Sequence, residues 1–165
     1  MAKYTLSVLV ENHAGVLSRV SGLFSRRGFN IDSLAVGSAE TPDLSRITIV
    51  VDGDEYIVDQ VRKQLSKLVD VRRVQLLDPN NSVARELVMI KVKVSKEKRP
   101  EVVQLVDIFR AKIIDVSTDT LTVLMTGEGN KTEALLTLLD DYGILEIART
   151  GILALERGLP VHDDE

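Results

Sequence analysis

A period-two pattern of apolar residues runs from position 4 to position 10 of the chain, and the pattern then changes to a helical spacing. The alternation ends at Val10 and predicts a strand with one buried face. From Val16, apolar residues recur every three or four positions, which predicts a helix that ends at Gly28. Arg19 falls mostly outside this stripe, so its side chain is expected to face water. The stripe consists of Val16, Leu17, Val20, Leu23 and Phe24.

The rest of the first half shows the same two periodicities. Alternating or β-branched apolar residues predict strands at 30–37, 45–51 and 69–77. A second helix is expected after Asp54, whose side chain is suited to cap it. Its apolar stripe is Ile57, Val58, Val61, Leu65 and Leu68. The first half therefore predicts the order β-α-β-β-α-β.

The second half predicts the same order of elements with different residues. The expected elements are a strand at 87–94, a helix opened by Pro100, strands at 113–116 and 120–126, a helix at 132–141 and a closing strand at 144–155. This order is typical of the ferredoxin-like unit, in which two helices cover one face of a four-stranded antiparallel sheet. The predicted fold class is α+β, with two ferredoxin-like βαββαβ domains.

The boundary between the halves is indicated by residues 78–82, which combine a proline with turn-forming residues. We expect a first domain at 1–77, a linker at 78–84 and a second domain at 85–165. Each predicted sheet leaves one face bare of helices, so oligomerisation is expected.

Composition excludes several classes of protein. The chain has 165 residues, and its net charge of −4 is spread without a basic face, which argues against nucleic acid as a partner. It has no cysteine, which excludes disulfides, thiolate zinc sites and cysteine nucleophiles. No apolar run is long enough to span a bilayer, and no signal peptide is recognised. We therefore expect a cytoplasmic protein that does not contact a membrane.

Residues that carry catalytic chemistry do not form a recognisable set. The histidines are His13, in a turn, and His162, near the end of the chain. A solvated loop residue is the expected role of His13. The acidic group formed by Asp52, Asp54 and Glu55 is expected to form a polar turn and a helix start, where negative charge suits the helix dipole. The sequence therefore predicts neither catalytic nor metal-binding residues.

A glycine-rich segment at 126–132 resembles a phosphate loop in its position between a strand and a helix. The spacing does not fit, because Asn130 separates Gly129 from Lys131 and Gly127 lies too close to them. We interpret this segment as a strand-to-helix turn.

The turn between Val10 and Val16 is the strongest candidate site. A strand that turns abruptly into a helix leaves the first helical N–H groups unpaired, and such an end binds anions. Gly15 lacks a Cβ, so a ligand can approach the backbone. The turn contains no Lys or Arg, which favours a carboxylate over a phosphate. The Asn12 side chain can accept from an ammonium group, so a free amino acid suits the site.

Three further residues are expected to complete this site. Asn30 and Ile31 begin the next predicted strand and are expected at the same end of the sheet, and Leu17 and Ile31 would supply aliphatic contact. The alternative is that Asn12 is only a helix cap or a turn residue and that Gly15 only permits close packing.

Several motifs resemble a known family. Residues 10–20 resemble the opening of an ACT domain, a small regulatory fold that binds amino acids. Further stretches resemble the small regulatory subunits of acetolactate (acetohydroxyacid) synthase, and together they cover nearly the whole chain. These stretches are 22–34, 44–46, 64–71, 84–87 and 109–116.

The resemblance implies a regulatory subunit without catalytic activity or a cofactor of its own. Its partner would be the large catalytic subunit, which carries thiamine diphosphate, Mg²⁺ and FAD in this family. The small subunit would activate that partner and confer feedback inhibition by valine in branched-chain amino acid biosynthesis. It would also form a homodimer through its ACT domains.

The resemblance also implies where valine binds, which is the interface between two ACT domains. One protomer would supply Asn12, Gly15, Val16 and Leu17, together with Ala14 at a position where the family varies, and the other would supply Asn30 and Ile31. A stand-alone ACT-type amino-acid sensor acting on another enzyme or regulator is the alternative. Residues 110–116, which resemble synthase small subunits in particular, argue for the regulatory subunit.

Overall fold

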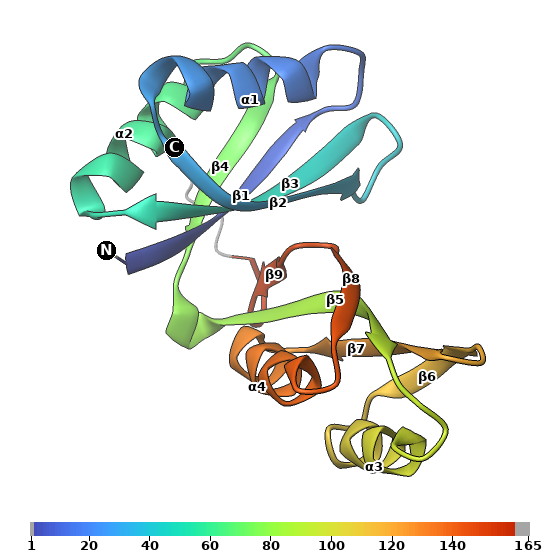
Figure 1. Cartoon of the computed structure of the whole chain (residues 1–165). Helices are drawn as coiled ribbons and strands as arrows, with labels where there is room; N and C mark the ends of the chain where they lie inside the picture. The colour runs from blue at the N-terminus through green and yellow to red at the C-terminus, as the bar shows by residue number, and fades with distance from the viewer. Residues whose placement is uncertain (1, 161–165) are drawn as a thin grey trace. The chain divides into compact units, whose positions relative to one another are not determined.

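The computed structural model describes residues 2–160. The chain divides into two compact units (Figure 1). One unit comprises Met1–Ala84 together with Ile152–Glu165, and the other comprises Arg85–Gly151. His162 lies outside the described residues.

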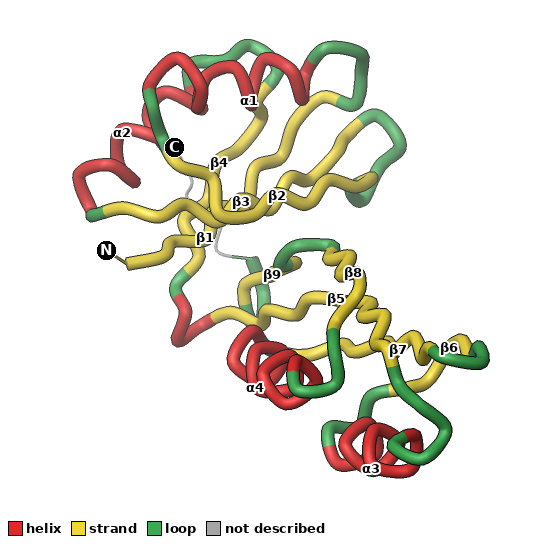
Figure 2. Tube along the Cα trace, viewed as in Figure 1, coloured by secondary structure: helices red, strands yellow, loops and turns green. Residues whose placement is uncertain are grey.

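The first unit is a four-stranded antiparallel sheet with two helices on one face (Figure 2). The strand order is β2-β3-β1-β4, so β2 and β4 are the edge strands. The predicted order of elements is confirmed. The elements are β1 (Ala2–Glu11), α1 (Val16–Arg27), β2 (Asn30–Ser38), β3 (Leu44–Gly53), α2 (Glu55–Ser66) and β4 (Val71–Leu77).

The core of this unit lies between the helices and the sheet, and it is almost entirely aliphatic. Period-two alternation places every second residue of β1 and β3 on the helix-covered face. The predicted helical stripes pack against them, with one exception: Leu17 is 45% exposed. The buried residues of this core are Leu6, Val8, Val10, Val16, Val20, Leu23, Phe24, Ile47, Ile49, Val51, Val61 and Leu65.

Local signals in the sequence set the helix ends as predicted. Gly28 ends α1 in the left-handed conformation with φ 68°, which a glycine adopts without steric cost. The Asp54 side chain caps α2, because its Oδ1 accepts a hydrogen bond from the Ile57 N–H over 2.9 Å.

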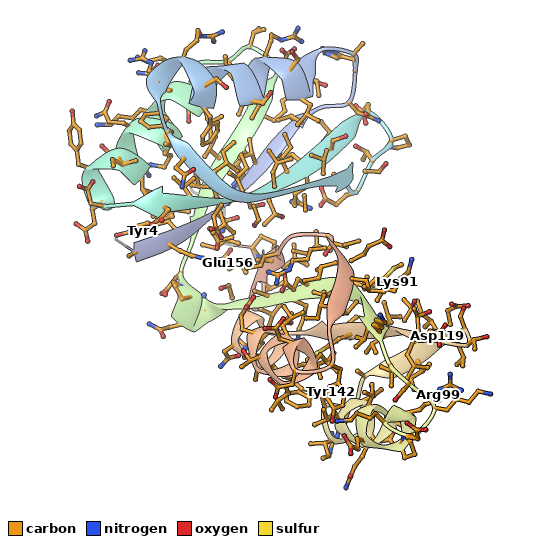
Figure 3. All side chains as sticks on the ribbon, viewed as in Figure 1. Tyr4, Lys91, Arg99, Asp119, Tyr142 and Glu156 are labelled. Atoms are coloured by element: carbon orange, nitrogen blue, oxygen red, sulfur yellow. The ribbon has the colours of Figure 1, made fainter. Side chains whose placement is uncertain are left out.

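The second unit has the same antiparallel arrangement, with strand order β6-β7-β5-β8. Pro100 lies in the first turn of α3, as predicted. Arg99, labelled in Figure 3, ties this helix to the turn after β6, because its Nη2 donates to the carbonyls of Ser117 and Thr118. The elements are β5 (Ser82–Lys93), α3 (Arg99–Ile108), β6 (Lys112–Val116), β7 (Thr120–Gly127), α4 (Gly129–Asp140) and β8 (Ile144–Arg149).

The end of the chain differs from the prediction. The single strand expected at 144–155 is two strands, β8 and β9 (Leu153–Glu156), because Gly151 adopts φ 77° and breaks the extended backbone. The chain from Ile152 onward groups with the first unit, although the sequence placed it in the second domain. The expected linker also contains structure, since Pro79–Asn81 form a short 3-10 helix and β5 begins at Ser82.

This returning segment lies against the helix-free face of the first sheet, which the sequence predicted to be bare. Strand β9 contacts β1 and β4, and the Gln75 Nε2 donates to Glu156 Oε2 over 2.8 Å (Glu156 is labelled in Figure 3). Together they enclose a cavity of about 490 Å³. Its lining is Ser7, Leu9, Glu40, Arg46, Arg73, Gln75, Leu77, Leu155, Glu156, Gly158 and Pro160.

Candidate functional site

The turn from β1 into α1 has an unusual backbone. Gly15 occupies the position just before the helix and has φ 87°, a left-handed conformation that costs a residue with a Cβ about 1–3 kcal/mol. No side chain within residues 2–160 caps α1. Asn12 therefore does not cap the helix, which leaves the other role in that alternative, that of a turn residue.

The start of α1 retains unpaired backbone donors. The first helical hydrogen bond is donated by the Arg19 N–H to the Gly15 carbonyl over 3.0 Å, and the Val16 N–H makes a long bond of 3.5 Å to the His13 carbonyl. Among the described residues, no backbone acceptor outside the helix pairs with the N–H groups of Leu17 or Ser18. These amides lie at the positive end of the helix dipole and can bind an anion.

Asn12 fixes the turn to the loop between β2 and β3. Its backbone N–H donates to the Asp43 carbonyl over 2.8 Å, and its Nδ2 donates to the Pro42 carbonyl over 2.9 Å. A hydrogen bond from Thr41 lowers the pKa of the Asp43 carboxyl, so this loop carries negative charge at neutral pH. Among the hydrogen bonds of the described residues, none is donated to the Asn12 Oδ1, which can therefore act as an acceptor.

A cation lies beside Gly15, although the turn itself contains none. The Arg19 Nη1 lies 2.9 Å from the position that a Cβ on Gly15 would occupy. The Nε of Arg19 donates to Asp70 Oδ2 over 2.6 Å, and the His13 Nε2 lies 3.4 Å from Asp70 Oδ1. The prediction that Arg19 faces water is confirmed, since this residue is exposed, but its guanidinium also lies beside a turn that itself contains no Lys or Arg. The guanidinium group therefore lies against the space left by the missing Cβ.

Asp70 lies between Arg19 and His13 and contacts both side chains. It is 7% exposed, and its carbonyl accepts from the Glu11 N–H over 2.9 Å, which joins the start of β4 to the end of β1. Glu11 in turn forms an ion pair with Arg72. The buried carboxylate therefore holds Arg19 at the turn and lies next to the His13 ring. The pairing of Asp70 with Arg19 has no signal in the sequence, because the two residues are 51 positions apart.

Asn30 and Ile31 lie at the other end of the sheet, so the expectation that they share an end with the turn is wrong. Asn30 is opposite Asp52 in the β2–β3 register, whereas Glu11 is opposite Leu44 in the β1–β3 register. These two β3 residues are about 27 Å apart at roughly 3.4 Å per residue. One copy of the chain therefore cannot bring Asn30 to the turn.

The remaining predicted site residues differ in what they present. Ala14 and Leu17 are exposed beside Gly15, whereas the Val16 side chain is buried in the core and can offer only its backbone. Asn30 is exposed, and the half-buried Ile31 packs against the core.

The structure does not support a phosphate-binding loop or a metal site among the described residues. The segment after β7 is a strand-to-helix turn, as predicted, and Thr132 is fully buried with its Oγ1 donating to the Glu128 carbonyl. Within residues 2–160, no three acidic or histidine side chains are grouped so that they could hold a metal ion. None of the helices in that range is both long enough and apolar enough to cross a bilayer.

Each half of the chain matches the model of a known protein family. Residues 6–73 match a family model described as an AHAS small subunit-like ACT domain. Residues 85–158 match a model described as the small subunit of acetolactate synthase.

Individual proteins of this kind are similar to the chain over nearly its full length. The chain is 53% identical over 156 residues to a probable acetolactate synthase small subunit of Archaeoglobus fulgidus, covering 94% of this chain and 98% of the relative. It is 52% identical over 155 residues to an acetolactate synthase small subunit of Mycolicibacterium smegmatis, covering 94% and 91%. The crystal structure of a small subunit of acetolactate synthase from Thermotoga maritima superposes with a TM-score of 0.90 at 46% identity, covering 97% of this chain and 100% of that one.

Proposed function

The chain belongs to the family of acetolactate synthase small subunits, and on this premise we propose that it binds L-valine and regulates a catalytic large subunit. It raises the activity of that subunit and confers feedback inhibition on it. The reaction takes place on the large subunit, which carries thiamine diphosphate, Mg²⁺ and FAD. The small subunit contributes regulation alone.

The uncapped start of α1 is the observation that carries this proposal. Gly15 allows the helix to begin without a capping side chain, and the amides that follow can accept the carboxylate of an amino acid. The Asn12 Oδ1 is available to accept from the ammonium group, since the amide nitrogen of that side chain is used by Pro42. The exposed Leu17 side chain supplies an apolar contact for a branched aliphatic side chain.

The second half of the site comes from a second copy of the chain. Strand β2 is an edge strand that begins at Asn30, and its end at Ser38 pairs with Ser45, close to the turn before α1. When two such edges pair antiparallel around a two-fold axis, the start of one β2 meets the end of the other. Asn30 and Ile31 of one protomer then lie at the end of the sheet where its partner holds Asn12 and Gly15.

A valine that bridges two protomers explains regulation in thermodynamic terms. Such a ligand stabilises the dimer arrangement in which both halves of its site meet, and so it shifts any equilibrium in which that interface differs. Coupling to the catalytic subunit follows if the activating and inhibited complexes differ in this interface.

The experiment that tests the proposal is reconstitution with the catalytic subunit. Acetolactate formation should rise when the small subunit is added and should fall again when millimolar valine is present. Calorimetry on the small subunit alone should detect valine binding. The proposal is wrong if valine produces neither heat nor a thermal shift in the isolated protein and does not inhibit the complex.

The alternative of a stand-alone amino-acid sensor has less support. The second half of the chain matches the synthase small-subunit model over residues 85–158, and a free-standing sensor would not need that domain. A sensor would also bind valine without changing the activity of the catalytic subunit, so the same reconstitution separates the two functions.

A further inference from the structure

We propose that Arg19 binds the carboxylate of the ligand directly and that Asp70 is the positioning residue that holds it there. This inference rests on the proposed function, because it concerns the same valine site. It adds a side-chain cation to a site that otherwise consists of backbone amides.

The geometry of α1 directs the Arg19 side chain toward Gly15 at the start of the helix. Long side chains on a helix point toward its N-terminus and lie over the residue four positions earlier, which for Arg19 is Gly15. Two guanidinium atoms confirm this direction, since Nη1 and Cζ lie 2.9 and 3.6 Å from the Cβ position of Gly15. A carboxylate seated on the amides at the start of α1 therefore has the guanidinium beside it.

The guanidinium keeps donors free for a ligand. Among the hydrogen bonds of the described residues, Arg19 uses only Nε, which donates to Asp70. Four N–H groups on Nη1 and Nη2 remain, and their fork matches the two oxygens of a carboxylate. The side chain is 48% exposed, so a ligand can reach it.

Asp70 prevents the guanidinium from moving away. Its carboxylate lies at the base of the turn with a side-chain exposure of 10%, and its bond to Arg19 is 2.6 Å long. The backbone of residue 70 is fixed in turn by Glu11. Because the arginine is already ordered, a ligand meets it without a large loss of side-chain freedom. His13 shares the same carboxylate on its other oxygen at 3.4 Å.

The same helix contains a matched control. Arg26 bears the same relation to Gly22 that Arg19 bears to Gly15, with its Nη1 3.5 Å from the Cβ position of Gly22. Arg26 lies in the last turn of α1, far from the uncapped start, and it forms no ion pair with another described residue. Replacing either arginine removes one positive charge from the helix, but only one replacement changes the site.

The test is calorimetry with L-valine and with L-valinamide, in which a neutral amide replaces the carboxylate. Wild type should bind valine much more tightly than valinamide. In Arg19→Gln the Kd for valine should rise by about tenfold or more, the loss of a charged hydrogen bond, while the Kd for valinamide changes little. Arg26→Gln should behave as wild type. Thermal unfolding without ligand checks that all variants are folded.

Two further results bear on the roles of the residues. Asp70→Asn should reduce the ratio between the two affinities, because the arginine is no longer held, whereas a purely structural role would weaken both ligands alike. Equal loss for valine and valinamide in Arg19→Gln, or no loss, would overturn the inference while leaving valine binding by wild type intact. Failure of wild type to bind valine would instead remove the proposed function, and the inference with it.

Discussion

Replacing Gly15 by aspartate should abolish the response to valine, because it places a carboxylate where the ligand's own carboxylate binds. The change has two separable effects. The first is backbone strain, since φ 87° is costly for any residue with a Cβ, by about 1–3 kcal/mol. This strain lowers the stability of the free protein, by about 2–4 °C in Tm for each kcal/mol.

The second effect is electrostatic. A new carboxylate about 4 Å from that of valine raises the free energy of the complex by about 4 kcal/mol at an effective dielectric constant of about 20. This corresponds to a Kd about a thousandfold higher. The new carboxylate also pairs with Arg19, whose Nη1 lies 2.9 Å from the Cβ position, and so withdraws the arginine from the ligand.

Gly15→Ala separates the two effects. It introduces the same Cβ and the same strain without the charge, and the neighbouring Arg19 Nη1 is the end of a flexible side chain that can shift. We expect Gly15→Ala to lose about tenfold in affinity or less, on the scale of one weakened charged hydrogen bond, and Gly15→Asp to lose far more. The affinity of each variant for valine is measured by calorimetry and by inhibition of the reconstituted complex. If the two variants bind valine equally, the anion site is not at Gly15.

Three further predictions concern the interface, the division of functions and the core. Asn30→His should weaken inhibition by valine and spare activation, measured as acetolactate formation with and without valine; equal loss of both would mean that activation uses the same residue. Val36→Glu, on the β2 edge where this side chain is 46% exposed, should shift the protein from dimer to monomer in sedimentation, and an unchanged dimer would exclude pairing through β2. Leu65→Ala, at a fully buried position, should lower the free energy of unfolding by about 2–5 kcal/mol in urea, and a smaller loss would mean that the core collapses into the space.

The fold was predictable because its signals are local. Strand and helix periodicities run through both halves, and Gly28, Asp54 and Pro100 mark helix ends with residues whose conformational preferences are strong. Gly151 was missed because a single glycine inside an apolar run does not show from sequence alone whether the strand continues.

The site was predictable only in part, because its geometry depends on contacts between distant segments. The abrupt turn at Gly15 shows in the sequence, but the pairing of Arg19 with Asp70 requires β4 to lie next to β1. The position of Asn30 at the opposite end of the sheet from the turn follows from the order of the elements. A helix that follows β1 runs back along the sheet, so the strand after it begins at the opposite end. That rule alone separates Asn30 from the turn and points to a second protomer.

The return of the chain at Ile152 makes the second unit an insertion within the first, with covalent attachments on either side at 84–85 and 151–152. A truncation after residue 84 would not yield an intact first unit, since it would also strip away β9 and the hydrogen bond from Gln75 to Glu156. A single-domain version that keeps β9 has to delete residues 85–151 and join residue 84 to residue 152 through a linker. The chain therefore crosses between the two units twice, once at each end of the insertion.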